Sequence, residues 1–171
     1  MVAANLRFAD EVKSIDSTAS YINVHFGYDL KKWRPDSDHL LSYSANKALG
    51  GGILLDAIHE LDYLYFKFGK IQDIFYNKSK LTNITNDTED LVVGRIYFES
   101  GTIADFSLNY LSEDYQRYYD ILEDGVLKRK NINISNQMYI DEMTYFIDCV
   151  VSNTQGMNSF NEANTLLTTI I

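Results

Sequence analysis

Asp56, His59 and Asp62 are the residues of this sequence whose types and spacing could carry out acid–base chemistry. They follow one another at steps of three, and residues three apart in a helix lie on the same side of it. A neutral imidazole can take the proton of a substrate hydroxyl, while Asp56 orients the ring or binds a neighbouring hydroxyl. The alternative is an exposed polar pair that only supports a helix, and the spacing alone favours that alternative.

The helix that would position these residues is expected over residues 53–68. When its residues are placed at about 100° per position, the apolar side chains form one continuous arc, which is typical of a helix packed on a core. The three polar residues lie outside this arc, and Asp62, which borders it, is expected to bind backbone groups of the preceding loop. Three glycines precede the helix and indicate a tight turn with close chain approach; anion binding by their N–H groups is the alternative.

A long connection of little periodicity, residues 29–49, leads into the glycines. Long ordered loops in compact domains more often carry function than not. Its aromatic and basic residues are therefore candidates for binding a substrate near the start of the helix: Trp33, Arg34, Tyr43 and Lys47. A Trp–Arg pair can stack and fork onto hydroxyl or phosphate groups, and a surface salt bridge is the alternative for Arg34.

The rest of the sequence alternates between strand and helix patterns. Period-two alternation predicts strands at residues 21–28, 71–80, 90–99, 102–110, 116–122 and 126–134. Helical periodicity returns over residues 136–152, with these expected core contacts: Met138, Met143, Phe146, Ile147 and Val150. Ser159 is expected to cap a last helix, since Glu162 follows three residues on.

Short turns between successive strands predict an α+β fold with an open, mainly antiparallel sheet of about six strands. Three helices can cover only one face of such a sheet, so its other face must meet solvent or a partner. Tyr21, Tyr97 and Tyr119 fall within strands, and tyrosine is common at protein interfaces. We therefore expect the protein to form a homo-oligomer through the open sheet face; the alternative is an exposed face with scattered tyrosines.

Composition narrows the class of protein and its partners. The 171 residues suit a single domain that spans 1–171. A net charge of −9 disfavours nucleic acid and anionic membranes as partners. No apolar stretch is long enough for a signal peptide near the start or for a bilayer span. Cys149 is the only cysteine, which excludes an internal disulfide and fits a cytoplasmic protein.

The sequence favours neither a metal site nor a nucleophilic enzyme. His25, His39 and His59 match no zinc-binding spacing, so no metal is expected. Cys149 lies in an apolar helical segment and is expected in the core. The sequence contains no G-x-S-x-G elbow for a serine nucleophile. Proton transfer by Asp56 and His59 therefore stays the catalytic hypothesis, with the helix-supporting pair as its alternative.

The segment 50–69 reads GGGILLDAIHELDYLYFKFG and resembles the start of the substrate domain in the Gfo/Idh/MocA family of sugar and cyclitol oxidoreductases. Similar short motifs surround it over nearly the whole chain: Asn5-Leu6-Arg7-Phe8, Trp33-Arg34-Pro35, Ser42-Tyr43-Ser44-Ala45, Tyr139-Ile140-Asp141-Glu142-Met143 and Phe146. In the family an Asp and a His on this helix work at the substrate, usually four positions apart, whereas Asp56 and His59 are three apart. The resemblance covers only the second half of such an enzyme.

The resemblance implies the substrate-binding and oligomerisation domain of an NAD(P)-dependent sugar or cyclitol dehydrogenase, as a fragment without the N-terminal Rossmann domain. In such enzymes a substrate C–H gives hydride to nicotinamide, and the family supplies a lysine from its nucleotide-binding half for the hydroxyl proton. Without that half, this chain is expected to be inactive and to bind NAD or NADP weakly or not at all. The substrate would be a sugar or a nucleotide-sugar. The alternative is a stand-alone, non-enzymatic sugar-binding or dimerisation module.

Overall fold

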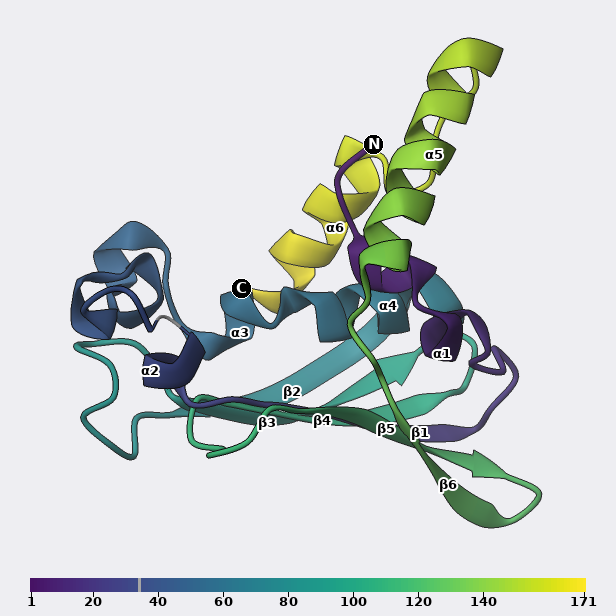
Figure 1. Ribbon diagram of the computed structural model, residues 1–171. Helices are drawn as coiled ribbons and strands as arrows, with labels where there is room; N and C mark the ends of the chain where they lie inside the picture. Colours follow the sequence, from purple (N-terminus) through teal and green to yellow (C-terminus); the bar gives the residue numbers. More distant parts are fainter. Residues whose placement is uncertain (34) are drawn as a thin grey trace.

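One sheet of six strands forms a layer of the protein, and the helices lie on one side of it (Figure 1). The computed structural model describes residues 1–33 and 35–171, so the predicted substrate-binding residue Arg34 lies outside the described residues. In the described part the strands are β1 (Tyr21–Gly27), β2 (Ile71–Ser79), β3 (Leu91–Phe98), β4 (Ile103–Asn109), β5 (Gln116–Glu123) and β6 (Val126–Asn131). The six predicted strands and the α+β class are confirmed.

The strands are ordered β2-β3-β4-β1-β5-β6. Neighbouring strands run antiparallel, as predicted, except β1 and β4, which run parallel with Val24 opposite Phe106. Because these two strands are parallel, their carboxyl ends lie side by side at one end of the sheet. Ligands of sheets with parallel strands commonly bind outside such ends, and several residues of the candidate site lie there.

The covered face of the sheet forms the core. Alternate residues of β1 point toward the helices, and Ile22, Val24 and Phe26 are fully buried. Leu61 and Leu64 on α4 (Ile58–Phe68) are equally buried. Full burial of such a side chain stabilises a fold by about 1.5–3 kcal/mol. The sheet and α4 therefore support each other, and the site residues on α4 stand on a rigid element.

The helix predicted over residues 53–68 is two helices, α3 (Ile53–Asp56) and α4, which meet at Ala57. Ala57 leaves the helical region with φ −101° and ψ 28°. The Glu60 N–H then donates to the Ala57 carbonyl three residues back, whereas an α-helical bond would reach four residues back. The prediction of one continuous helix is wrong, and the break falls between Asp56 and His59.

The long helix α5 (Asn136–Ser152) projects away from the sheet beside α6 (Phe160–Ile170) (Figure 1). Met138 near its start is buried. The other predicted core contacts are 42–63% exposed: Met143, Phe146, Ile147 and Val150. Cys149, also predicted in the core, is half-buried. The helix was predicted correctly but its burial was not, because periodicity identifies an apolar face without identifying what covers it.

Short helical turns complete the described chain: η1 (Asn5–Phe8), α1 (Asp10–Lys13), α2 (Leu30–Trp33), η2 (His39–Leu41), η3 (Tyr43–Ala45) and η4 (Lys47–Leu49). The last four divide the long connection before the glycines into short ordered turns. At the start of α6, Ser159 Oγ accepts from the Glu162 N–H at 3.2 Å, as the capping pattern predicted. No helix in the described part of the chain is both long and apolar enough to cross a membrane.

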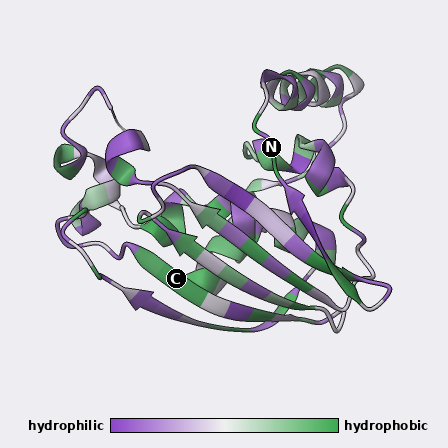
Figure 2. Ribbon diagram, turned by 60° about the horizontal axis from the view of Figure 1, so that its bottom comes forward, coloured by the Kyte–Doolittle hydropathy of each residue, from purple (hydrophilic) through white to green (hydrophobic). Residues whose placement is uncertain are grey.

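Polar and apolar residues alternate along the strands of the sheet (Figure 2), because successive side chains point to opposite faces. The open face carries Tyr21, Asn23 and His25 of β1. One row crosses five strands in register, from β3 to β6: Arg95, Asp105, Asn23, Asp120 and Arg129. Arg95 forms two hydrogen bonds to Asp105, at 2.6 and 2.8 Å. Arg129 forms two to Asp120, at 2.7 and 2.8 Å. Every charge of this row is therefore paired within the face.

The strand tyrosines divide between the two faces. Tyr21 lies on the open face, where its hydroxyl donates to Asp105 at 2.9 Å. Tyr97 shares that face, since it alternates with the buried residues of β3. Tyr119 points to the covered face, is 1% exposed, and donates its hydroxyl proton to the Glu11 carbonyl at 2.7 Å. Tyr119 is therefore a core residue and is not available for an interface.

Candidate functional site

The glycines before α3 allow the long connection to approach the helix closely. A Cβ on Gly51 would lie 2.0 Å from the Tyr43 carbonyl oxygen, so a side chain has no room there. Gly52 has φ 117°, which favours glycine, and its N–H donates to the Ser44 carbonyl at 3.0 Å. Close approach is therefore the role that the structure supports. The alternative was an anion bound by the N–H groups of these glycines, but the Glu89 carboxylate already lies against Gly52.

Asp56 ends α3 and is held by two hydroxyl groups. Its Oδ2 accepts hydrogen bonds from Ser44 Oγ at 2.6 Å and from Tyr110 OH at 2.7 Å. Tyr110 follows β4 and is fully buried; burial and the Asp56 charge raise the pKa of its hydroxyl, which stays protonated at neutral pH. The two donors fix the carboxylate in one orientation through Oδ2.

His59 lies in the first turn of α4, beyond the break. It lines a small cavity together with Val2 and Ala3 at the N-terminus and Asp62 one turn farther along. Burial lowers the pKa of His59, the Arg117 charge lowers it further, and the Asp62 charge opposes both. The imidazole is therefore neutral at pH 7, the form that can accept a proton.

Asp56 and His59 both lie where the helix start was predicted, but they face different neighbours. Asp56 faces the long connection and the end of β4, through Ser44 and Tyr110. His59 faces the N-terminal segment and α6 across the small cavity. Because the chain leaves the helix at Ala57, the geometry of one continuous helix does not describe their relative position.

Asp62, the weaker third candidate, belongs to a buried ion pair. Arg7 donates from Nε and Nη2 to its two carboxylate oxygens, both at 2.8 Å. The Arg7 side chain is 1% exposed, and it also reaches Glu162 on α6 at 3.2 Å and the Phe66 ring at 4.7 Å. The expected partner, backbone of the preceding loop, was wrong. The pair ties the N-terminal segment to α4 and α6.

Sequence reasoning missed a second buried ion pair, Glu60 with Arg117. Glu60 is fully buried, and its Oε1 lies 2.7 Å from Arg117 Nε, although the angle is not that of a hydrogen bond. Burial raises the pKa of the Glu60 carboxyl, and the Arg117 charge opposes that rise. Two features of the sequence indicated this pair. At about 100° per residue Glu60 lies beside Ile53, at the border of the apolar arc. Arg117 is two residues from Tyr119 in β5, so both side chains point to the covered face of the sheet.

An aromatic cluster lies at the carboxyl end of β1. The Phe26 ring is 5.4 Å from the Trp33 ring, and the Arg117 guanidinium lies 4.5 Å from the Phe26 ring centre. Trp33 is also 6.2 Å from Tyr110, the residue that holds Asp56. The cluster therefore joins the Asp56 side of the site to the Arg117 side.

The predicted substrate-binding residues are spread over the connection. Trp33 is the one that the described structure brings into the aromatic cluster. Tyr43 lies in η3, is 48% exposed and precedes Ser44, which holds Asp56. Lys47 lies in η4, where its backbone N–H donates to Asp87 at 2.7 Å and its side chain is exposed. Tyr43 thus borders the Asp56 side of the site, and Lys47 lies farther along the loop.

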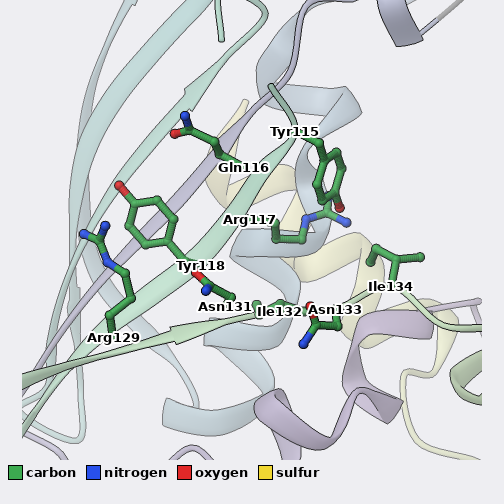
Figure 3. Close-up of a pocket in the computed structure, with 9 residues that line it drawn as sticks. All are labelled: Tyr115, Gln116, Arg117, Tyr118, Arg129, Asn131, Ile132, Asn133 and Ile134. Carbon is green, nitrogen blue, oxygen red and sulfur yellow. The ribbon is translucent and has the colours of Figure 1, made fainter. Parts of the chain in front are cut away.

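An open hollow of about 840 Å³ lies where β5 begins and β6 ends (Figure 3). Tyr115 and Arg117 lie together at one end of it, and Tyr118 and Arg129 lie together at the other. The remaining lining residues are Gln116, Asn131, Ile132, Asn133 and Ile134. Arg117 belongs both to this hollow and to the ion pair with Glu60, the residue that follows His59.

The histidines lie in separate surroundings. His25 stacks on Tyr118 on the open sheet face, with ring centres 4.9 Å apart. His39 lies in η2, with Nδ1 3.8 Å from Asp38. Among residues 1–33 and 35–171, no group of three or more His, Cys, Asp or Glu side chains is placed to hold a metal ion.

Comparison with known proteins gives one family match and several similar structures. A family model described as "GFO/IDH/MocA C-terminal domain" matches residues 18–127. No curated protein matches the sequence. Among solved structures, the chain is similar to GenD2 from gentamicin A biosynthesis in complex with NAD, with 16% identity and a TM-score of 0.75.

Two further structures are similar at the same level. One is myo-inositol 2-dehydrogenase from Lactobacillus plantarum, with 14% identity and a TM-score of 0.73. The other is aldose-aldose oxidoreductase from Caulobacter crescentus complexed with glycerol, with 15% identity and a TM-score of 0.74. The matches cover 98%, 96% and 99% of this chain but only 58%, 58% and 59% of the three structures. At these identities the likeness shows the fold alone.

Proposed function

The chain belongs to the GFO/IDH/MocA C-terminal domain family, and from this premise we propose that it is the substrate-binding and oligomerisation half of an NAD(P)-dependent sugar or cyclitol dehydrogenase. The observation that carries the proposal is the pair on α3 and α4. It consists of a carboxylate held by two hydroxyl donors and, three residues on, a half-buried neutral imidazole. A chain with one cysteine suits a reducing compartment, so we place the enzyme in the cytoplasm.

In the proposed reaction an alcohol is oxidised to a carbonyl compound. His59 accepts the hydroxyl proton. NAD or NADP, held by a separate nucleotide-binding half, would supply the acceptor for the hydride from the same carbon. Asp56, held through Oδ2 by Ser44 and Tyr110, presents Oδ1 to a neighbouring hydroxyl and orients the substrate. Because burial keeps the imidazole neutral, it is ready to act as the base.

We assign no cofactor site to this chain. A pyrophosphate group binds N–H groups at a Gly-rich helix start. The Gly-rich start that this chain offers, at Gly52, already faces the Glu89 carboxylate, which would repel a second negative charge. NAD and NADP are therefore expected to bind weakly or not at all, and submicromolar binding by calorimetry would contradict this.

The nucleotide-binding half is proposed to pack against α5. The chain covers 58% of the GenD2 chain, which leaves length for such a half in the whole protein. Phe146 and Val150 on α5 are 42% and 63% exposed, and both line a cavity together with Met1. A domain that precedes residue 1 would meet this apolar face at once. Burying the face would stabilise the contact, at about 25 cal/mol per Å² of apolar surface.

Self-association is proposed through the open sheet face. The two arginines of its central row, Arg95 and Arg129, are already paired with Asp105 and Asp120. Burial of this row would therefore leave neither of its arginines without a partner, and an unpartnered charge is the main cost of burying charged groups. Tyr21 adds an aromatic surface of the kind that is common at interfaces.

The test is turnover by an enzyme in which this chain is joined to its nucleotide-binding half. We expect His59→Ala to lower turnover by at least about a hundredfold, since a general base contributes about 10²–10⁴-fold. Circular dichroism should show an unchanged fold. The chain alone should show no turnover.

The matched control is His39→Ala, which removes a histidine of the connecting loop outside the proposed machinery and should leave turnover unchanged. Equal turnover by the His59→Ala and wild-type enzymes would contradict the proposal. That result would favour the stand-alone sugar-binding or dimerisation module.

A further inference from the structure

The open face of the sheet presents one row of residues, here called the charged row, that crosses all six strands. In the strand order β2-β3-β4-β1-β5-β6 its members are Phe75, Arg95, Asp105, Asn23, Asp120 and Arg129. From β3 to β6 the charges are positive, negative, neutral, negative and positive. The charges are therefore symmetric about Asn23 on β1, whereas the centre of the sheet lies half a strand away, between β4 and β1.

The two arginines of the charged row keep N–H groups for a partner. Arg95 donates from Nε and Nη2 to Asp105, and Arg129 donates from the same two atoms to Asp120. A guanidinium carries five N–H groups, so these pairs leave three of them unused on each arginine. An N–H group that is buried without an acceptor costs free energy. A surface that covers this row must therefore offer each arginine an acceptor or an aromatic ring.

We propose that a second copy covers the open face with the two-fold axis parallel to the strands and between β4 and β1, so that Arg95 of each copy meets the partner's Asp120. The inference rests on the self-association proposed above and specifies its geometry. Such an axis sets each strand against the strand at the opposite place in the order: β2 against β6, β3 against β5, and β4 against β1. Sheets that pack face to face commonly keep their strands aligned in this way, within about 30°.

This arrangement satisfies the charged row across the interface. Asp120 uses one lone pair of each oxygen for Arg129 of its own chain, so it can also accept from the partner's Arg95. The Phe75 ring is 64% exposed and can receive the partner's Arg129 as a cation on its face. The contacts between the copies, each formed twice, are Arg95 with Asp120, Asp105 with the Asn23 amide, and Arg129 with Phe75.

Other two-fold axes fit the charged row less well. An axis along β1 would set Arg95 against the partner's Arg129. An axis along the row itself would set each charge against its own copy. Like charges that face each other across an interface disfavour it. An axis between β1 and β5 brings opposite charges together, but it leaves β2 and β3 uncovered, with Phe75 and Val93 exposed.

The area of the face suits a dimer of this kind. Strands of six to nine residues give the six-strand sheet a flat area of roughly 700 Å² before its projecting side chains are counted. A stable interface commonly buries about 800 Å² on each partner. In the next row, Val93 on β3 lies opposite the partner's Tyr118 on β5, which adds an apolar contact. A full face of six strands is therefore needed, and the central axis uses all of it.

Thiol cross-linking between two copies measures which edge strands face each other. In a Cys149→Ser background, one chain carries Asn77→Cys on β2 and the other carries Asn131→Cys on β6. The proposed axis sets these positions about 10 Å apart, the separation of packed sheets, and sets two copies of either position about 24 Å apart across the strands. A cross-linker that spans about 10 Å should join the mixed chains and give at least about tenfold less product with either chain alone.

The matched control is Lys78→Cys mixed with Lys130→Cys, one residue along the same two strands. Both lysines are exposed, but they lie opposite the buried Val92 and Tyr119 and so point to the other face of the sheet. This pair should not cross-link.

Equal product from the control pair would overturn the arrangement, and so would more product from either asparagine variant alone than from the mixture. Light scattering of the same chains separates this inference from the self-association on which it rests. A dimer without a link between positions 77 and 131 would overturn the proposed axis alone, whereas a monomer would overturn self-association as well. Turnover of the His59→Ala enzyme decides the proposed dehydrogenase function independently of both results.

Discussion

Guanidinium–carboxylate pairs occur at different depths in this protein, and depth decides what each pair does. Arg7 with Asp62 is almost wholly buried, whereas Arg95 with Asp105 lies at the surface. An exposed pair contributes at most about 1 kcal/mol, because water and salt screen it. Breaking a buried pair costs about 3–5 kcal/mol, because the remaining charge has lost its solvent and its partner. The buried pairs therefore position the helices around the site.

Asp62→Asn should lower the free energy of unfolding by about 3 kcal/mol, since it leaves the Arg7 guanidinium buried beside a neutral amide. The control is Asp105→Asn, which breaks an equally short but exposed pair and should cost less than about 1 kcal/mol. Urea denaturation of the two variants measures both values. Equal losses would contradict the structural role given to Arg7 and Asp62.

His59→Gln should make the stability of the chain less dependent on pH below neutrality. Burial and the Arg117 charge lower the folded-state pKa of His59, and the Asp62 charge opposes them. As pH falls, the unfolded chain therefore binds a proton at His59 before the folded chain does. The contribution of neutral His59 to stability is therefore fully present above the ordinary histidine pKa of about 6.5, and this contribution is lost as pH falls below that value.

Urea denaturation at about pH 7.5 and about pH 5.5, on either side of that value, measures the effect. The wild type should lose more stability between the two conditions than His59→Gln does. The lowered carboxyl pKa values of Asp105 and Asp120 act equally in both proteins and cancel in the difference. The same pH dependence in both proteins would show that His59 is not held neutral.

At the scale of elements, α3 is a four-residue helix fixed at both ends by the same loop residue. The Ser44 carbonyl accepts from the Gly52 N–H before the helix, and Ser44 Oγ donates to Asp56 at its end. A helix this short has no stability of its own. Tertiary contacts therefore set the direction of α3, whereas α4 packs on the sheet. The two helices meet at the break at Ala57. The orientation of Asp56 depends on this loop more than on helical periodicity.

Gly51→Ala should destabilise the protein by about 3 kcal/mol and loosen the Asp56 side of the site. Its Cβ would lie 2.0 Å from the Tyr43 carbonyl oxygen and 2.7 Å from the Ser44 carbonyl oxygen, so the backbone must move. The control is Gly101→Ala in the β3–β4 turn, where φ is 89° but no atom lies within 4 Å. It should cost only about 1–2 kcal/mol. A smaller loss for Gly51→Ala by thermal denaturation would contradict the close approach.

At the scale of the whole molecule, apolar side chains remain exposed on two separate surfaces. One is the face of α5 that carries Phe146 and Val150, beside the first residue of the chain. The other is the open face of the sheet, where Phe75 and Val93 are 64% and 50% exposed. The described helices lie on the opposite side of the sheet (Figure 1). A domain of this kind that buries both surfaces would contact its nucleotide-binding half through α5 and a second copy through the sheet.

Val93→Arg should convert a self-associating chain into a monomer. Val93 lies on the open face of β3 opposite Ser107 and is 50% exposed, so a charge there would be buried without a partner in an interface. The control is Val126→Arg at the β5–β6 turn, a valine that is 58% exposed at the rim of the sheet. Light scattering should give twice the chain mass for the wild type and for Val126→Arg. A monomeric wild type would contradict the proposed surface.

The sequence by itself determined the six strands, the α+β class and the helical segment with its acid–base residues. These features follow from local periodicity, since alternation of two along a strand and about 3.6 along a helix is a property of neighbouring residues. The close approach at Gly51 was also predicted, because residues without a Cβ let another part of the backbone come close. The catalytic roles of Asp56 and His59 stay predictions.

Only the tertiary structure decided which residues neutralise the buried charges and where the helix breaks. Asp62 is paired with Arg7, 55 positions away, and Glu60 on α4 is paired with Arg117 on β5. Local periodicity carries no information about such pairs, because they depend on which faces the fold brings together. The exposure of the apolar face of α5 could not be predicted for the same reason. The sequence pattern shows that a helix face is apolar, but only the packing shows whether another element covers that face.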